Sequence, residues 1–145
     1  MTAPLAPSSP APSFIRPALG LLAGLGITAL IVGPGIVIAT LAMLRGVADP
    51  RAFRAAPEHL AVYLVIIAVG AFAGGLATAR ITVGRSFYTV FLMALVLFTS
   101  AMVFVLRGGE SAQAEPRWFT WARAITVLVA ALLGGFLERR RQASQ

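Results

Sequence analysis

Cysteine, lysine and asparagine are absent from this chain of 145 residues, so all 12 of its basic residues are arginine. Without cysteine the chain can form no disulfide, and it offers no thiolate to a metal or to a redox reaction. The arginine bias accompanies many alanines, glycines and prolines. We interpret it as GC-rich coding rather than as selection for guanidinium chemistry.

Charge of either sign is also scarce. Charged residues make up 12% of the chain and hydrophobic residues 59%, and the mean hydropathy is +0.88. An ordinary soluble domain has about a quarter charged residues, so too few are present here to cover a soluble surface of this size. The formal net charge of +7 comes from arginines beside apolar runs. We therefore expect the lipid bilayer as the main partner and no nucleic acid.

Four apolar runs are each long enough to cross a bilayer as a helix. They cover about residues 18–44, 60–79, 87–106 and 119–137, and the last one reaches this length only if its first turn lies among the lipid headgroups. None shows the alternation of barrel strands. The sequence predicts an all-α bundle of four transmembrane helices over 17–138, between a disordered Pro/Ala/Ser-rich tail (1–16) and a basic C-terminal tail (139–145).

An even number of spans places both termini on one side of the membrane, but the arginine count does not decide which side. With the termini inside, six arginines are inner (Arg16, Arg80, Arg85, Arg139, Arg140, Arg141) and six are outer (Arg45, Arg51, Arg54, Arg107, Arg117, Arg123). Two topology anchors favour the arrangement with both termini in the cytoplasm. They are the cluster Arg139, Arg140 and Arg141, and an outer belt of Trp118 and Trp121.

The two halves of the chain share landmarks in the same order, which points to an internal repeat. The pairs are Leu44-Arg45-Gly46 with Leu106-Arg107-Gly108, Asp49-Pro50-Arg51 with Glu115-Pro116-Arg117, and Ala73-Gly74-Gly75 with Leu133-Gly134-Gly135. Their spacings differ between the halves. Two related helical hairpins are therefore predicted, and duplication of an ancestral hairpin is left open.

Small residues four apart recur near the ends of the second and fourth runs, where they would let helix backbones approach closely. We expect these faces to pack against each other or against a second copy, although glycine is also simply frequent in membrane helices. The helix-packing candidates are Gly70, Gly74, Gly75, Ala130, Gly134 and Gly135.

The stretch from Gly70 to Arg80, with Pro116-Arg117-Trp118-Phe119, resembles a group of small uncharacterised bacterial four-helix integral membrane proteins. Those proteins carry a similar Gly-Ala-x-x-Gly-Gly-x-x-Ala-x-Arg stretch and a Pro-x-Trp-Phe entry to the last span. The likeness in layout covers roughly residues 18–138. It implies the four-helix architecture and a bacterial inner membrane, and it implies no activity.

Ionisable groups are missing from the interior of all four runs, where membrane enzymes and ion-coupled carriers need them. Arg123, near the start of the fourth run, is expected to extend outward to the headgroups. The adjacent Glu58 and His59 point about 100° apart on a helix, so we expect a solvated pair at the membrane surface rather than an acid–base or metal pair. No catalytic residue, metal site or cofactor is predicted.

Two polar features could still form a site. Gly33-Pro34-Gly35 lies in the middle of the first run, and its proline predicts a kink or an unwound stretch of the kind that binds ions or solutes. Thr99 and Ser100 lie in the middle of the third run. They could line a pore or bond to carbonyls of their own helix.

The sequence favours a non-enzymatic structural, accessory or assembly role in the inner membrane, with a homo-oligomer or other membrane proteins as partners. The alternative is a small oligomeric channel or facilitator for a neutral or weakly polar solute.

Overall fold

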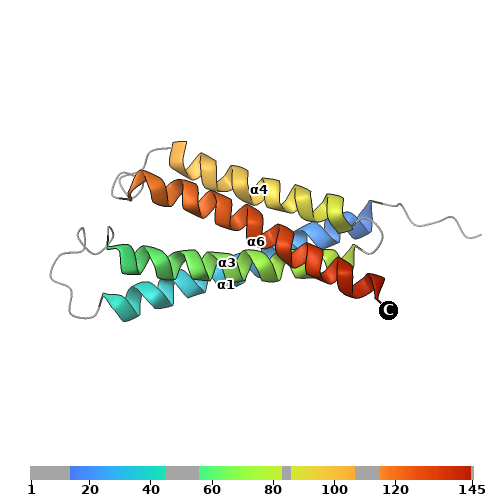
Figure 1. The fold of residues 1–145 in the computed structure, drawn as a ribbon, viewed down its shortest axis with the longest axis horizontal. Coiled ribbons are helices and arrows are strands. Elements are labelled where there is room, and N and C mark those ends of the chain that lie inside the picture. The colour runs from blue at the N-terminus through green and yellow to red at the C-terminus, as the bar shows by residue number, and fades with distance from the viewer. Residues whose placement is uncertain (1–13, 45–55, 83–85, 107–114, 145) are drawn as a thin grey trace, which may run out of the picture.

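A computed structural model describes residues 14–44, 56–82, 86–106 and 115–144. Within these residues the chain forms four α-helices and no strand, which confirms the all-α prediction. The helices are α1 (Ile15–Met43), α3 (Pro57–Ile81), α4 (Ser86–Leu106) and α6 (Arg117–Ala143), as labelled in Figure 1.

Helix boundaries follow the local chemistry of the chain. Pro57 opens α3 with Glu58 in the first turn, where a missing N–H and a negative charge are both favourable, and Pro116 stands immediately before α6. The helices are longer than the apolar runs. Arg16, expected in the N-terminal tail, lies in α1, and the basic segment 139–143 is the last part of α6. The rest of the predicted tail, residues 1–13, is outside the described residues.

Three helices, α1, α3 and α6, are long and apolar enough to cross a membrane. In α4 the apolar stretch whose side chains are described, Phe87–Val103, is shorter than these three helices. Large hydrophobic side chains are exposed along all four helices, including Leu30 on α1, Val65 on α3, Phe87 on α4 and Trp121 on α6. This surface suits lipid and not water.

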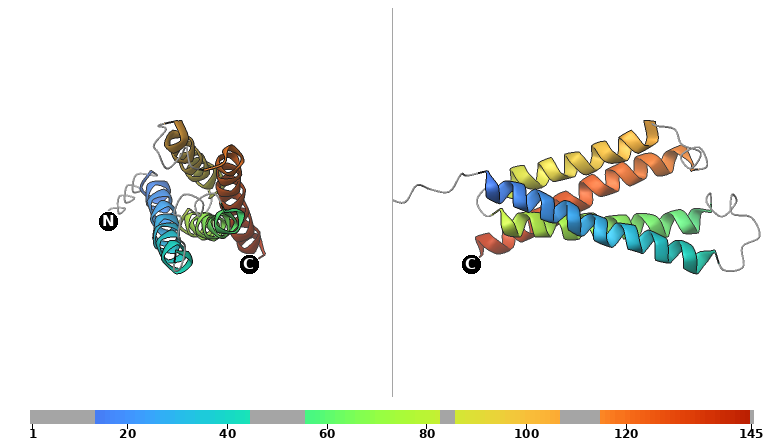
Figure 2. Two further views of the ribbon diagram at one scale, coloured as in Figure 1. Left: turned by 90° about the vertical axis from the view of Figure 1, so that its left-hand side faces the viewer. Right: turned by 180° about the vertical axis from the view of Figure 1, so that it is seen from behind.

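The helices converge at one end of the molecule and diverge at the other. α3 packs against α1, α4 and α6, while α4 also packs against α6 and α1. Figures 1 and 2 show that α1 and α3 form one pair, that α4 and α6 form another, and that the two pairs move apart toward one end. We call this the open end; it holds Met43, Pro57, Leu106 and Arg117. The closed end holds Ile15, Ile81, Ser86 and Ala143.

Glycines bring α1 and α3 into backbone contact toward the closed end. A Cβ on Gly74 would lie 2.6 Å from the carbonyl oxygen of Gly24, and one on Gly24 would lie 2.8 Å from the carbonyl oxygen of Gly74. Real Cβ atoms do not approach so closely. The sulfur of Met93, which is fully buried, reaches the same point from α4. Three helices therefore meet where only glycine fits.

A second set of close contacts joins α3 to α6. The position of a Cβ on Gly75 is occupied by the Ala131 backbone, and that of a Cβ on Gly134 by the Phe72 backbone. Ala71 and Ala131 are both fully buried in the core between these helices. Close approach is thus reciprocal, because each helix places a glycine against the main chain of the other.

The small residues of α3 divide between two partners. Gly70 and Gly74 face α1, whereas Gly75 faces α6, and Gly135 of α6 faces Val90 of α4. The sequence spacing suggested one contact between the second and fourth runs. In the structure, neighbouring glycine faces of α3 pack against two different helices, α1 and α6.

Gly33-Pro34-Gly35 lies within continuous helix, so the expected unwound stretch is not there. Gly33 and Pro34 are exposed on the outside of α1, while the position of a Cβ on Gly35 meets the side chain of Ile66. Proline removes only one backbone hydrogen bond. Keeping the remaining helical bonds avoids leaving further amides unpaired where water is absent.

Substituting Gly75→Ala should lower the free energy of unfolding by about 1–3 kcal/mol, because the new methyl group overlaps the Ala131 backbone, which cannot rotate away. Gly26→Ala is the matched control, since nothing lies within 4 Å of a Cβ there. Helix propensity alone should leave the control unchanged or slightly more stable. Denaturation followed by circular dichroism in detergent micelles measures both, and equal stability of the two variants would contradict the close α3–α6 contact.

Candidate functional site

Buried threonines use their hydroxyls to bond helix backbones. The hydroxyl of Thr78 on α3 lies 3.1 Å from the carbonyl oxygen of Gly20 on α1, to which it donates. Thr28 on α1 lies 2.9 Å from the Gly24 oxygen of its own helix and 3.2 Å from the Gly70 oxygen of α3. Both side chains are buried. These polar groups therefore strengthen the α1–α3 contact.

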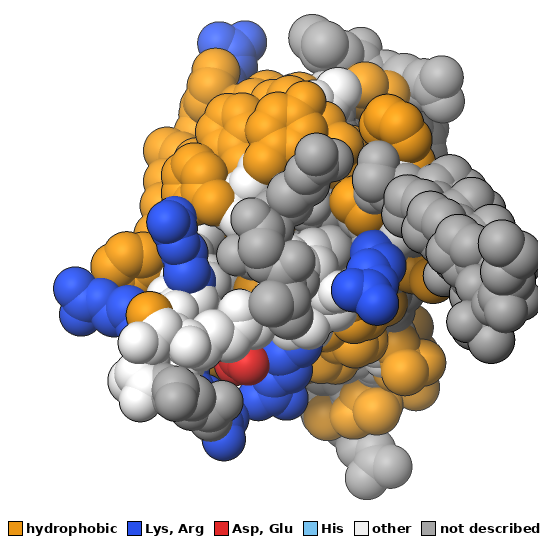
Figure 3. All heavy atoms as spheres, turned by 90° about the vertical axis from the view of Figure 1, so that its right-hand side faces the viewer, with side chains coloured by type: hydrophobic (Ala, Val, Ile, Leu, Met, Phe, Trp, Pro, Cys, Tyr) orange, Lys and Arg blue, Asp and Glu red, His pale blue; other side chains and the backbone are white. Residues whose placement is uncertain are grey.

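The closed end is charged. Figure 3 looks onto this end and shows several separate arginine side chains (blue) and an acidic side chain (red) among the apolar ones. Arg80 of α3 reaches the buried Glu138 of α6 at 3.2 Å, and the Gln142 amide donates to the Ala79 carbonyl at 3.3 Å. Both contacts join α3 to α6, the two helices that Gly75 and Gly134 also bring together. The predicted anchors Arg139, Arg140 and Arg141 are exposed at this end.

His59 at the open end is buried, so the expectation of a solvated Glu58–His59 pair is wrong for the histidine. Its Nδ1 lies 3.4 Å from the Met43 sulfur, its ring packs 4.1 Å from the Tyr63 ring, and the Tyr63 hydroxyl bonds Thr40. His59 and Tyr63 are four residues apart, and this spacing predicts that the two rings lie side by side on one face of a helix. Its partners on α1 could not be read from spacing.

An elongated groove of about 350 Å³ lies between α1 and α4, and sequence reasoning missed it. We call it the α1–α4 groove. Its walls are mostly apolar and come from all four helices: Leu25, Thr28, Ala29, Val32, Ile36, Ile67, Leu97, Ser100, Ala101, Arg123 and Val127. The residues of α1 recur at intervals of three and four, so they form one stripe along that helix.

Arg123 is the only charged residue among the described lining of this groove. Its side chain is 17% exposed, and its Nη1 lies 3.9 Å from a carboxylate oxygen of Glu115, which is too long for a hydrogen bond. Trp118 and Trp121, on the preceding turn of α6, are exposed. Such residues mark the membrane–water boundary. The groove thus has a cationic head, on the helix that carries these tryptophans, and an apolar body.

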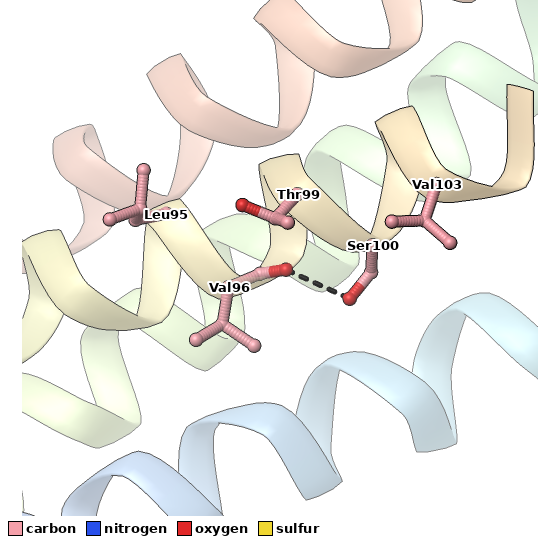
Figure 4. A pocket seen from close by; sticks show the side chains of 5 residues that line it. All are labelled: Leu95, Val96, Thr99, Ser100 and Val103. Atoms are coloured by element: carbon pink, nitrogen blue, oxygen red, sulfur yellow. Dashed lines mark hydrogen bonds between the residues drawn. The ribbon is translucent and has the colours of Figure 1, made fainter. Parts of the chain in front are cut away.

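Thr99 and Ser100 are exposed on α4, where they line an open hollow of about 450 Å³ with Leu95, Val96 and Val103 (Figure 4). The Ser100 hydroxyl donates to the Val96 carbonyl at 2.8 Å, which is a bond within its own helix. Its side chain points toward α1, and Ser100 lies in both the hollow and the α1–α4 groove. The Gly33-Pro34-Gly35 segment and this serine do not form a joint polar site, because Gly33 and Pro34 are exposed on the outside of α1.

Within the described residues no group of three histidine or acidic side chains is close enough to hold a metal ion. Comparison of the chain with protein families, curated proteins and solved structures finds no match. The resemblance to uncharacterised four-helix membrane proteins therefore stays a prediction.

The hydrogen bond from Thr78 of α3 to Gly20 of α1 should contribute modestly to the free energy of unfolding. Thr78→Val keeps the shape of the side chain and removes its hydroxyl, so the free energy of unfolding should fall by about 0.6 kcal/mol, the average for such bonds in membranes. Ser100→Ala is the control, because its bond lies within one exposed helix. Equal effects of the two substitutions in detergent denaturation would show that the Thr78–Gly20 bond adds nothing to helix association.

Proposed function

We propose that this chain is a non-enzymatic accessory protein of the bacterial inner membrane, which acts by packing and binding within the bilayer. One observation carries the proposal. The buried polar groups that join its helices, Thr28, Thr78 and Glu138, bond other parts of the same chain. Their chemistry is used to hold helices together, which suits a structural element.

The proposal includes four transmembrane helices with both termini in the cytoplasm. α4 has 21 residues, or about 32 Å of helix, which matches a hydrocarbon core of about 30 Å. The arginines of the closed end would lie at the cytoplasmic surface, and the exposed Trp118 and Trp121 at the outer one.

We also retain the proposal of two related hairpins. α1 packs with α3 and α4 packs with α6, as two consecutive hairpins would. In addition, the Gly-Gly landmark of each half lies where helices meet, since Gly75 of α3 and Gly134 of α6 each lie against the main chain of the other helix. Both hairpins thus use the same Gly-Gly landmark for close helix contact, as two related hairpins would.

Single-cysteine labelling tests the topology directly, because the chain has no cysteine of its own. Ser144→Cys should react with a membrane-impermeant maleimide in inside-out vesicles and stay unlabelled in intact spheroplasts. Ala52→Cys, in the loop between the first two spans, should show the reverse. Labelling of both positions from the same side would contradict the four-span topology.

Liposome flux separates the accessory role from the alternative facilitator. Purified protein in liposomes should give no flux above protein-free vesicles for water, glycerol, urea or small amides, because α1 is continuous and the Ser100 hydroxyl bonds its own helix. Flux that Ser100→Leu abolishes and the exposed-face control Leu30→Ala leaves intact would overturn the accessory role and establish the facilitator.

A further inference from the structure

We infer that the α1–α4 groove binds one anionic phospholipid, with the phosphate at Arg123 and an acyl chain between α1 and α4. This inference rests on the proposed insertion into a membrane. None of the residues that line this groove is His59, Met43, Tyr63 or Thr40, so it is distinct from the His59 cluster.

The depth of Arg123 is the first argument. α6 has 27 residues, about 40 Å, so about 5 Å should project beyond a core of about 30 Å at each end. Arg123 lies six residues after Arg117, about 9 Å from the start of the helix. Its Cα therefore lies just inside the hydrocarbon region, where a guanidinium needs an anion or must extend outward.

The lipid phosphate is the anion available at this level. Glu115 lies 3.9 Å from Nη1 of Arg123, but a guanidinium carries five N–H donors and can bind a carboxylate and a phosphate together. An anionic headgroup adds a favourable charge that a zwitterionic one lacks. The interaction is strengthened because the side chain is largely shielded from water.

The body of the groove suits an acyl chain. Its stripe on α1 runs from Leu25 to Ile36, a rise of about 16 Å along the helix. The volume of about 350 Å³ is within the range of ligand pockets. Val32, Leu97 and Val127 present hydrocarbon on three helices. A transmembrane helix without an acidic side chain would fit less well, since it would bring no anion to the charged head of the groove.

Binding of lipid to the purified, delipidated full-length protein can be followed by native mass spectrometry. We expect one molecule of dioleoyl phosphatidylglycerol to bind more tightly than dioleoyl phosphatidylcholine. Arg123→Gln should weaken phosphatidylglycerol binding about tenfold, the loss of one charge-assisted hydrogen-bond pair. Arg139→Gln, at the exposed closed end, is the matched control and should leave the affinity unchanged.

A second variant tests the acyl chain separately. Ala29→Phe should fill the groove from an exposed position and weaken binding of both lipids, whereas Ala18→Phe, on the same helix outside the groove, should not. Circular dichroism checks that each variant remains folded. Loss of binding in the Ala29→Phe protein alone supports the groove as the site.

Three results would overturn the inference: equal phosphatidylglycerol affinity in wild type and Arg123→Gln, displacement of the lipid by millimolar inorganic phosphate, or a protein dimer that Ala29→Phe dissociates. Failure of the membrane proposal is distinguishable, because the wild-type chain would then be absent from the membrane fraction. If only the lipid site is wrong, the wild-type chain would still be found in the membrane fraction.

Discussion

Close backbone contact between helices, at positions where only glycine fits, is the constraint on which the rest of the structure depends. In lipid the helices gain little from hydrophobic burial against each other, so association depends on packing and on a few polar bonds. Gly24 and Gly74 join α1 to α3, while Gly75 and Gly134 join α3 to α6. α3 is central because it offers a small face to each neighbour.

The open end follows from the position of these contacts. Gly20, Gly24, Gly74 and Gly75 all lie toward the closed end, as does the Arg80–Glu138 ion pair. The α1–α3 pair and the α4–α6 pair are joined near the closed end and cross at an angle, so they separate at the other end, as Figures 1 and 2 show. The α1–α4 groove is one consequence, and the position of Arg123 gives it a charged head.

The sequence was sufficient for the helices and insufficient for their partners. Long apolar runs predict helices because lipid leaves the backbone no other hydrogen-bond partners. Spacing identifies Gly70, Gly74 and Gly75 as small faces, but which helix each face meets depends on crossing angles set by the whole bundle. Pro34 shows a related limit, since a local rule predicts disruption and the surrounding helix tolerates the loss of one bond. Likewise, the burial of His59 depends on α1, which is distant in sequence.

The central claim is that the bundle is held at one end and open at the other, and spin-label distances test it most directly. Labels on cysteines introduced at exposed sites of α1 and α4 would report the closed end (Leu19 with Phe87) and the open end (Leu41 with Val103). Double electron–electron resonance should give a clearly longer separation at the open end. Equal separations at the two ends would contradict the account.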